Sequence, residues 1–139
     1  MHRTTAVALL GAIVIAVAGT GAALAASTGP SVTVQIKTLT KTLRSSVVHG
    51  EKGWITKDGT PKGKCPGNSG AGALDAATHG RWTARYYSQY GDVLVTSILG
   101  VKPMGKEFWE LVVNGKVASA GICALKLRAH EKILFKIAK

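Results

Sequence analysis

Near its start the chain contains a long run without a charged side chain, from Thr4 to Val34. The run follows Arg3 and, at Ala23-Leu24-Ala25, offers small residues at positions −3 and −1 of a cleavage point. A basic start, an apolar centre and small residues at the end are typical of a secretory signal peptide. Removal of such a segment leaves enough chain for one domain and not for two.

We therefore expect residues 1–25 to be a signal peptide, residues 26–30 a polar lead-in and residues 31–139 one folded domain. The protein is then secreted and extracellular, and association with the cell wall is a further expectation. The alternative is a protein anchored in the membrane by an uncleaved N-terminal segment, because a bilayer is spanned by about 20 apolar residues. After cleavage no stable membrane span is expected.

Basic residues outnumber acidic ones, with 18 Lys and Arg against 7 Asp and Glu and a formal net charge of +11. Cleavage would remove only Arg3 from this count, so the mature chain stays strongly basic. A secreted domain of this charge is drawn to anionic surfaces, and an anionic cell-wall polymer or glycan is the expected partner. The alternative is solubility with non-specific attraction, because the lysines form no long run. No specific nucleic-acid partner is expected, and the oligomeric state is left open.

The chain contains two cysteines, Cys65 and Cys123. An even number of cysteines in an exported chain favours a disulfide, which would close a long loop. The alternative is a free reactive thiol. Zinc sites need further ligands at short spacing, which these cysteines lack, so no metal is expected.

Two regions before residue 70 differ in pattern. Apolar and polar residues alternate from Val32 to Lys37, which predicts a strand, and the β-rich character continues to Val48 with a turn near Thr40-Lys41. Residues 49–70 are crowded with Gly, Pro, Asp, Asn and Lys and predict a loop, with a short strand around residues 54–56.

The glycine-rich stretch "SGAGALDAATHG" predicts a short helix. Asn68 or Ser69 is suited to the N-cap, where its side-chain oxygen would accept a free N–H of the first turn. Gly80 is placed to end the helix in a left-handed conformation. The phosphate-binding alternative fails, because "GTPKGKC" lacks the spacing of a nucleotide loop and no hydrophobic strand precedes "GNSGAG". The residues expected to face inward are Leu74, Ala77 and Thr78.

After Trp82 the β-pattern returns and continues to the C-terminus. Asn114-Gly115 is a strong signal for a tight turn, and a second turn is expected near His130-Glu131. One short helix against about five or six mainly antiparallel strands is an α+β fold with one covered sheet face. The alternation predicts these core or strand residues: Val93, Val95 and Ile98; Trp109, Leu111 and Val113; Leu125 and Leu127; Ile133, Phe135 and Ile137.

Taken together, the segments "CPGNSGAGALDAATHGRW", "VTSILG", "FWELVVNGKVASAGIC" and "KILFKI" resemble a bacterial secreted domain of unknown function. That family is similar to the C-terminal domain of the vitamin B12 carriers transcobalamin and intrinsic factor. The resemblance covers roughly residues 32–138. It implies an exported domain with a β-grasp-like, ubiquitin-like fold, a mainly antiparallel sheet with one short helix, and a disulfide between Cys65 and Cys123.

Two positions depart from the family's pattern. His130-Glu131 stands where the family usually has Gly-Asp before its last strand, and Phe108 stands at the first position of its Tyr-Trp pair. In the carriers, cobalamin lies between this domain and a helical domain, and this sequence contains no helical domain of that kind. No cofactor is therefore expected, with cobalamin as the alternative that the resemblance names.

No arrangement of residues indicates catalysis, and we expect no enzyme activity. His49, His79 and His130 lack the paired spacing of metal ligands, and "GNSGAG" misses the nucleophile elbow G-x-S-x-G by one position. Tyrosine and tryptophan near lysines can stack on a sugar or a planar ligand. Trp54, Tyr86 and Tyr87 are the ligand-binding candidates, whereas Trp82 and Trp109 are expected in the core.

The sequence thus predicts an exported, non-catalytic binding module of unknown ligand that associates with the cell envelope through its positive charge. One alternative is a carrier domain for a small, cobalamin-like ligand. Another is a purely structural surface domain.

Overall fold

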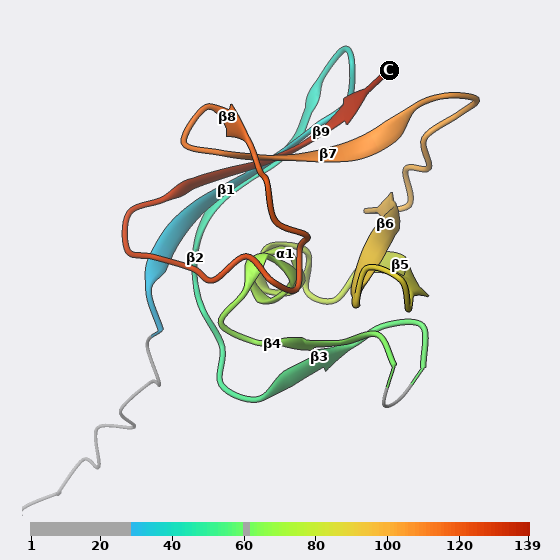
Figure 1. The fold of residues 1–139 in the computed structure, drawn as a ribbon. Coiled ribbons are helices and arrows are strands. Elements are labelled where there is room, and N and C mark those ends of the chain that lie inside the picture. The colour runs from blue at the N-terminus through green and yellow to red at the C-terminus, as the bar shows by residue number, and fades with distance from the viewer. Residues whose placement is uncertain (1–28, 60–61) are drawn as a thin grey trace, which may run out of the picture.

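The structure is a computed structural model and describes residues 29–59 and 62–139. The expected signal peptide, residues 1–25, and most of the lead-in lie outside the described residues. The described chain forms an α+β domain with one helix and nine strands in three sheets (Figure 1). Five or six strands were expected, and the additional ones are short.

The largest sheet has five strands in the order β2-β1-β9-β7-β8. β1 and β9 pair in parallel, and the other neighbours are antiparallel. The alternation from Val32 to Lys37 and the turn before the second strand are confirmed. The strands are β1 (Ser31–Lys37), β2 (Thr42–His49), β7 (Phe108–Val113), β8 (Lys116–Val117) and β9 (Lys132–Ala138).

One face of this sheet forms the hydrophobic core. In the register of β7 and β9, Trp109, Leu111 and Val113 lie opposite Ile137, Phe135 and Ile133, so they share a face as predicted. Val113 is only half-buried, however, and Val112 on the other face is buried. The buried residues contributed by β1 and β9 are Val32, Val34, Ile36, Ile133, Phe135 and Ile137.

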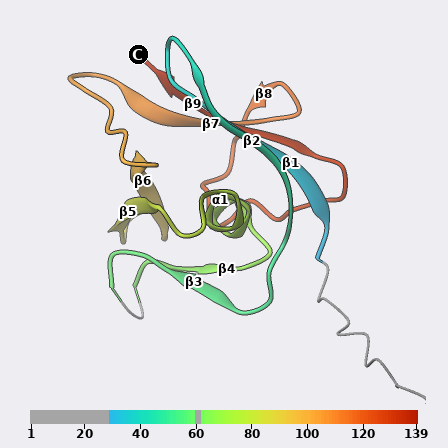
Figure 2. The ribbon, with the colours of Figure 1, turned by 180° about the vertical axis from the view of Figure 1, so that it is seen from behind.

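Helix α1 (Gly70–Thr78) lies between the five-stranded sheet and two separate hairpins (Figures 1 and 2). One hairpin is β3 (Trp54–Thr56) with β4 (Lys64–Pro66), and the other is β5 (Trp82–Tyr87) with β6 (Asp92–Ile98). Elements on several sides bury this nine-residue helix almost all round, beyond the stripe that its sequence predicted. The described chain contains no helix long and apolar enough to cross a membrane.

The start of α1 shows why this stretch is rich in glycine. A Cβ at Gly72 would overlap the carbonyl of Gly67. The first amides of the helix are already engaged, because Gly70 N–H donates to the Leu125 carbonyl (2.9 Å) and Ala71 N–H to the Ile122 carbonyl (3.1 Å). These are amides that a phosphate would need. The predicted helix is confirmed, and its N-terminus is occupied by the protein's own loop.

The two ends of α1 differ in how well they were predicted. Ser69 is the N-cap residue, but its hydroxyl donates to the Pro66 carbonyl (2.5 Å) and makes no side-chain cap, so the predicted capping bond is wrong. At the other end Gly80 is left-handed with φ 76°, as predicted. His79 shares this conformation with φ 52° and is the C-cap residue.

Two further expectations concern the C-terminal third. Leu125 and Leu127 do not lie on a strand, because their segment forms turns and makes only an isolated bridge between Ser69 and Lys126. Its alternating pattern reflects Leu127 pointing into the core. The turn before β9 forms as predicted, and His130 adopts φ 66° there without the family's glycine.

Candidate functional site

A groove of about 350 Å³ lies at the tip of the β5–β6 hairpin, and its lining is mostly apolar. Tyr90 in the hairpin turn is 77% exposed, and Leu94 on β6 is 47% exposed. Large apolar side chains that stay exposed beside polar groups mark interaction sites. We call this site the tyrosine groove, and it is lined by Tyr87, Gln89, Tyr90, Asp92, Val93, Leu94 and Gly121.

The carboxylate of Asp92 fixes the wall of the groove. Its Oδ1 accepts N–H groups from Val93 (2.7 Å) and Cys123 (3.0 Å), and its Oδ2 accepts the N–H of Ala124 (3.3 Å). Gly121 lies so close that a Cβ there would overlap Oδ2. Asp92 therefore joins the hairpin to the loop after β8, two segments about 30 residues apart along the chain.

A disulfide between Cys65 and Cys123 ties the same loop to β4. This is the pairing that the resemblance implied, and the described chain contains no free cysteine. Cys65 is fully buried in the core. The groove wall is thus held from two directions, which favours a site that exists before any ligand arrives.

A second cavity of about 150 Å³ adjoins the groove and shares Val93, Leu94 and Gly121 with it. Trp109 also lines this cavity and is only 6% exposed. Its indole Nε1 is buried and has no hydrogen-bond partner in the described chain. Buried N–H groups normally have partners, so this one is an unsatisfied donor in a residue that lines the cavity.

The three predicted ligand residues do not meet. Trp54 is exposed (59%) on β3, in a different hairpin from the tyrosine groove, with the ammonium of Lys64 4.1 Å above its ring. Tyr86 packs against the core, and its backbone N–H donates to Asp58 Oδ2 (2.7 Å). Only Tyr87 lines the groove.

Sequence reasoning missed the other groove residues. Tyr90 stands before Gly91 and Asp92, and an aromatic residue in such a turn was a usable signal. Gly121 comes from a segment about 30 residues further along the chain and gave no local signal. Trp82 and Trp109 were expected in the core, and both are buried there.

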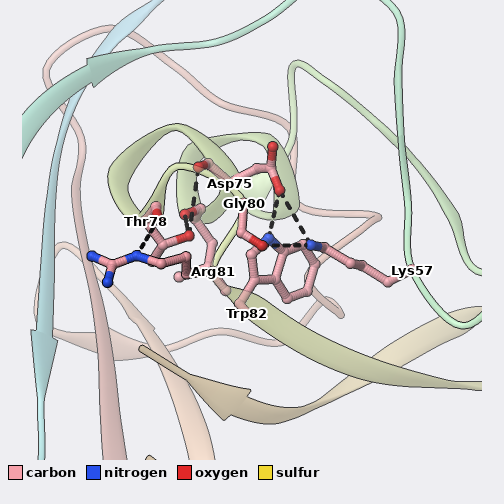
Figure 3. A network of polar contacts seen from close by, with 7 residues as sticks. Lys57, Asp75, Thr78, Gly80, Arg81 and Trp82 are labelled. Carbon is pink, nitrogen blue, oxygen red and sulfur yellow. Dashed lines mark hydrogen bonds and ion pairs between the residues drawn. The ribbon is translucent and has the colours of Figure 1, made fainter. Parts of the chain in front are cut away.

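A network of polar contacts lies where the β3–β4 hairpin meets the helix (Figure 3). Asp75 Oδ1 accepts the indole N–H of Trp82 (2.7 Å) and pairs with Lys57 Nζ (3.5 Å). Lys57 Nζ also donates to the Gly80 carbonyl (3.0 Å) and lies 4.7 Å from the centre of the Trp82 ring. The polar groups of this network therefore have partners within it, and their contacts join the hairpin to the helix.

Metal-binding groups are scattered. Across residues 29–59 and 62–139, no three His, Cys, Asp or Glu side chains are arranged to hold a metal ion. His49 ends β2 with its Nδ1 3.1 Å from the Gly29 carbonyl, His79 caps the helix, and His130 lies in the last turn.

The fold and the geometry of this site define the protein as an α+β domain with a small groove at the tip of a hairpin. Residues 72–139 match a domain of unknown function, DUF4430. The match begins in α1 and runs to the C-terminus, so it contains every residue that lines the tyrosine groove. No curated protein matches the sequence.

Two solved structures are similar in fold. Haptocorrin in complex with Cbi aligns over 79% of this chain with 15% identity and a TM-score of 0.58. A protein from Ruminococcus gnavus ATCC 29149, named as a candidate metal binding protein, aligns over 79% of this chain with 10% identity and a TM-score of 0.55. This chain spans about a quarter (25%) of the haptocorrin chain and 97% of the other. At these identities the likeness concerns the fold.

Proposed function

We propose that the protein is an exported, non-catalytic binding module that holds the apolar part of a ligand in the tyrosine groove. The groove itself is the observation that carries the proposal. Exposed Tyr90 and Leu94 lie beside a wall that Asp92 and the disulfide hold in place. A preformed apolar groove with a few polar groups is the usual form of a small-ligand site.

We also infer that the sheet and its helix form a β-grasp. The order β2-β1-β9-β7-β8 brings the first and last strands together in parallel at the centre, and one helix packs on one face. This supports the ubiquitin-like outline that the sequence resemblance implied. The β5–β6 hairpin and the loop after β8 lie outside this sheet, and the tyrosine groove is lined by residues of these two segments.

A small planar ligand is the carrier version of this proposal. The fold of haptocorrin, a protein crystallised in complex with Cbi, supports it. This chain spans only a quarter of that one, and the exposure of Tyr90 means that the groove covers a ligand from one side. We therefore expect a ligand that is sandwiched between this module and a second surface. The competing outcome is a purely structural domain.

Fluorescence of the tryptophans tests the groove, because Trp109 lines the adjoining cavity. A panel that includes a corrinoid and other planar ligands is titrated into the protein and into Leu94→Asp. Leu39→Asp is the matched control, since Leu39 is 52% exposed on the β1–β2 turn against 47% for Leu94. Saturable quenching that Leu94→Asp weakens about tenfold and Leu39→Asp leaves unchanged is expected. Equal behaviour of both variants, or no quenching by the panel, would contradict the proposal.

Association with the cell envelope through positive charge is the second function that we propose. The observation behind it is the use of the acidic side chains. All of them except Glu51 accept a hydrogen bond or pair with a lysine inside the described chain; they are Asp58, Asp75, Asp92, Glu107, Glu110 and Glu131. Only three of these acids pair with a lysine, which leaves most lysines and arginines without an acidic partner among the described residues.

A further inference from the structure

The polar side chains of strand β2 occupy an unexpected face of the sheet. Arg44 lies opposite Ile36 and Ser46 opposite Val34 in the register of β1 and β2. Residues directly opposite one another in an antiparallel pair share a face. Ile36 and Val34 are fully buried, so Arg44 and Ser46 project from the face that carries the core and the helix.

The helix does not fill the space in front of these side chains. Across from β2 it presents the small residues Ala76 and Ala77. An open groove of about 610 Å³ results, larger than the tyrosine groove, and we call it the basic groove. It is lined, among others, by Arg44, Ser46, His49, Lys52, Ala76 and His79. Figures 1 and 2 both place β2 and the β5–β6 hairpin on opposite sides of the helix, so the two grooves are separate sites.

Three polar side chains in the basic groove, those of Arg44, Ser46 and Lys52, lack partners within the described residues, whereas His49 Nδ1 lies 3.1 Å from the Gly29 carbonyl. None of the three ion pairs found there involves Arg44 or Lys52. The Oγ of Ser46 is buried and has no hydrogen-bond partner in that part of the chain. Glu51 is the one acidic residue in the lining. The groove thus combines unpaired cations with a free hydroxyl, which is complementary to an oxyanion.

We propose that the basic groove binds a polymer of the cell envelope whose polyol units are linked by phosphodiesters. Arg44 lies on β2 and Lys52 lies three residues beyond the end of that strand, so the two cations are held apart, and this separation suits a repeating anion more than a single phosphate. No Phe, Tyr or Trp lines the groove, so it lacks the large aromatic platforms on which the bases of a single-stranded nucleic acid stack. The inference rests on the proposed export of the protein and is independent of the tyrosine groove.

The test measures binding of purified polyglycerol phosphate by calorimetry at low and high salt. We compare Arg44→Gln/Lys52→Gln with Lys102→Gln/Lys106→Gln, which removes the same charge from an exposed loop. We expect at least about a tenfold loss of affinity for the first variant and a change within about twofold for the second. Equal losses would mean attraction by net charge alone and would overturn the proposal.

Two more variants separate the groove from the surface charge. Glu51→Gln removes the acidic lining residue and is expected to tighten binding about two- to threefold. Ala76→Leu fills the groove without changing the charge, and because leucine is a good helix former the fold should survive, which circular dichroism checks. A folded Ala76→Leu protein that binds the polymer as the wild type does would overturn the proposal.

Two other polyanions test the choice of polymer, and Leu94→Asp tests whether the two grooves are separate. A single-stranded DNA oligonucleotide or polygalacturonate that binds as tightly as polyglycerol phosphate would overturn the choice of polymer. Leu94→Asp is expected to bind the polymer normally, and a loss there would overturn the separation of the two sites. Failure of export would appear only as the absence of the protein from culture medium and envelope fractions, so it is distinguishable from failure of the groove.

Discussion

Replacement of Asp92 by alanine is expected to loosen the wall of the tyrosine groove. The carboxylate accepts N–H groups from Val93, Cys123 and Ala124 at 2.7, 3.0 and 3.3 Å. The Val93 bond is local to its own strand. The bonds to Cys123 and Ala124 join distant segments, and alanine would leave these two amides without their acceptor.

The magnitude follows from the bonds that cross between segments. A hydrogen bond to a charged group contributes about 1.5–3 kcal/mol, and the bond to Ala124 is long, so we count about 2–3 kcal/mol for the pair. For a domain of this size a loss of 1 kcal/mol lowers the melting temperature by roughly 4–8 °C. Asp92→Ala should therefore melt about 10–20 °C lower than the wild type. Asp92→Asn keeps one carbonyl acceptor and should lose about half as much.

Gly121 supplies a sharper version of the test. A Cβ at Gly121 would overlap Asp92 Oδ2, so Gly121→Ala should destabilise the wild type but cost much less in the Asp92→Ala background. Calorimetric melting of the two single variants and the double variant gives the coupling between the residues. Hydrogen exchange of the Cys123 and Ala124 amides reports the loop directly.

Two results would contradict this role of Asp92. If Asp92→Ala melts within about 2 °C of the wild type and both amides stay protected, the disulfide and the bonds from Gly70 and Ala71 hold the loop without the carboxylate. Additive losses in the double variant would show that Gly121 is not required by the carboxylate.

Two predictions concern the packing of α1, both read by chemical denaturation. Gly72→Ala should lower the free energy of unfolding by about 1–3 kcal/mol, because the added methyl overlaps the Gly67 carbonyl; an unchanged midpoint would contradict this close approach. Asp75→Ala leaves the indole N–H of Trp82, a residue only 3% exposed, without its acceptor. A loss of about 1–3 kcal/mol is expected, more than for the control Lys57→Met, and the reverse order would contradict it.

The parts of the fold that were predictable rest on local chemistry. The strand at residues 31–37 follows from alternation, and the hairpin between β7 and β8 from Asn114-Gly115, which adopt φ 51° and 83°. The end of α1 follows from Gly80. In each case neighbouring residues alone restrict the backbone, so no distant contact was needed to make the prediction.

The parts that were missed depend on contacts between distant segments. The Ser69 hydroxyl bonds to Pro66 because the amides that it would cap are taken by carbonyls of the loop at residues 122–125. The alternation of Leu125 and Leu127 looked like a strand, but the loop is bonded to the start of the helix and is tied to β4 by the disulfide and to the β5–β6 hairpin by Asp92. A pattern of period two reports which side chains are buried, and it does not require a ladder partner.

The candidate sites show the same division. Composition alone indicated a basic protein, and the structure adds that most acidic side chains accept hydrogen bonds or pair with a lysine inside the described chain. Composition could not indicate that Arg44 would share a face with Ile36, because that depends on the register of β1 and β2. A side chain larger than that of Ala76 on the helix would fill the space in front of Arg44. The basic groove therefore depends on two residues, a small one on the helix and an arginine on the inner face of the sheet. Each can be replaced separately, so the basic groove can be tested more directly than the tyrosine groove.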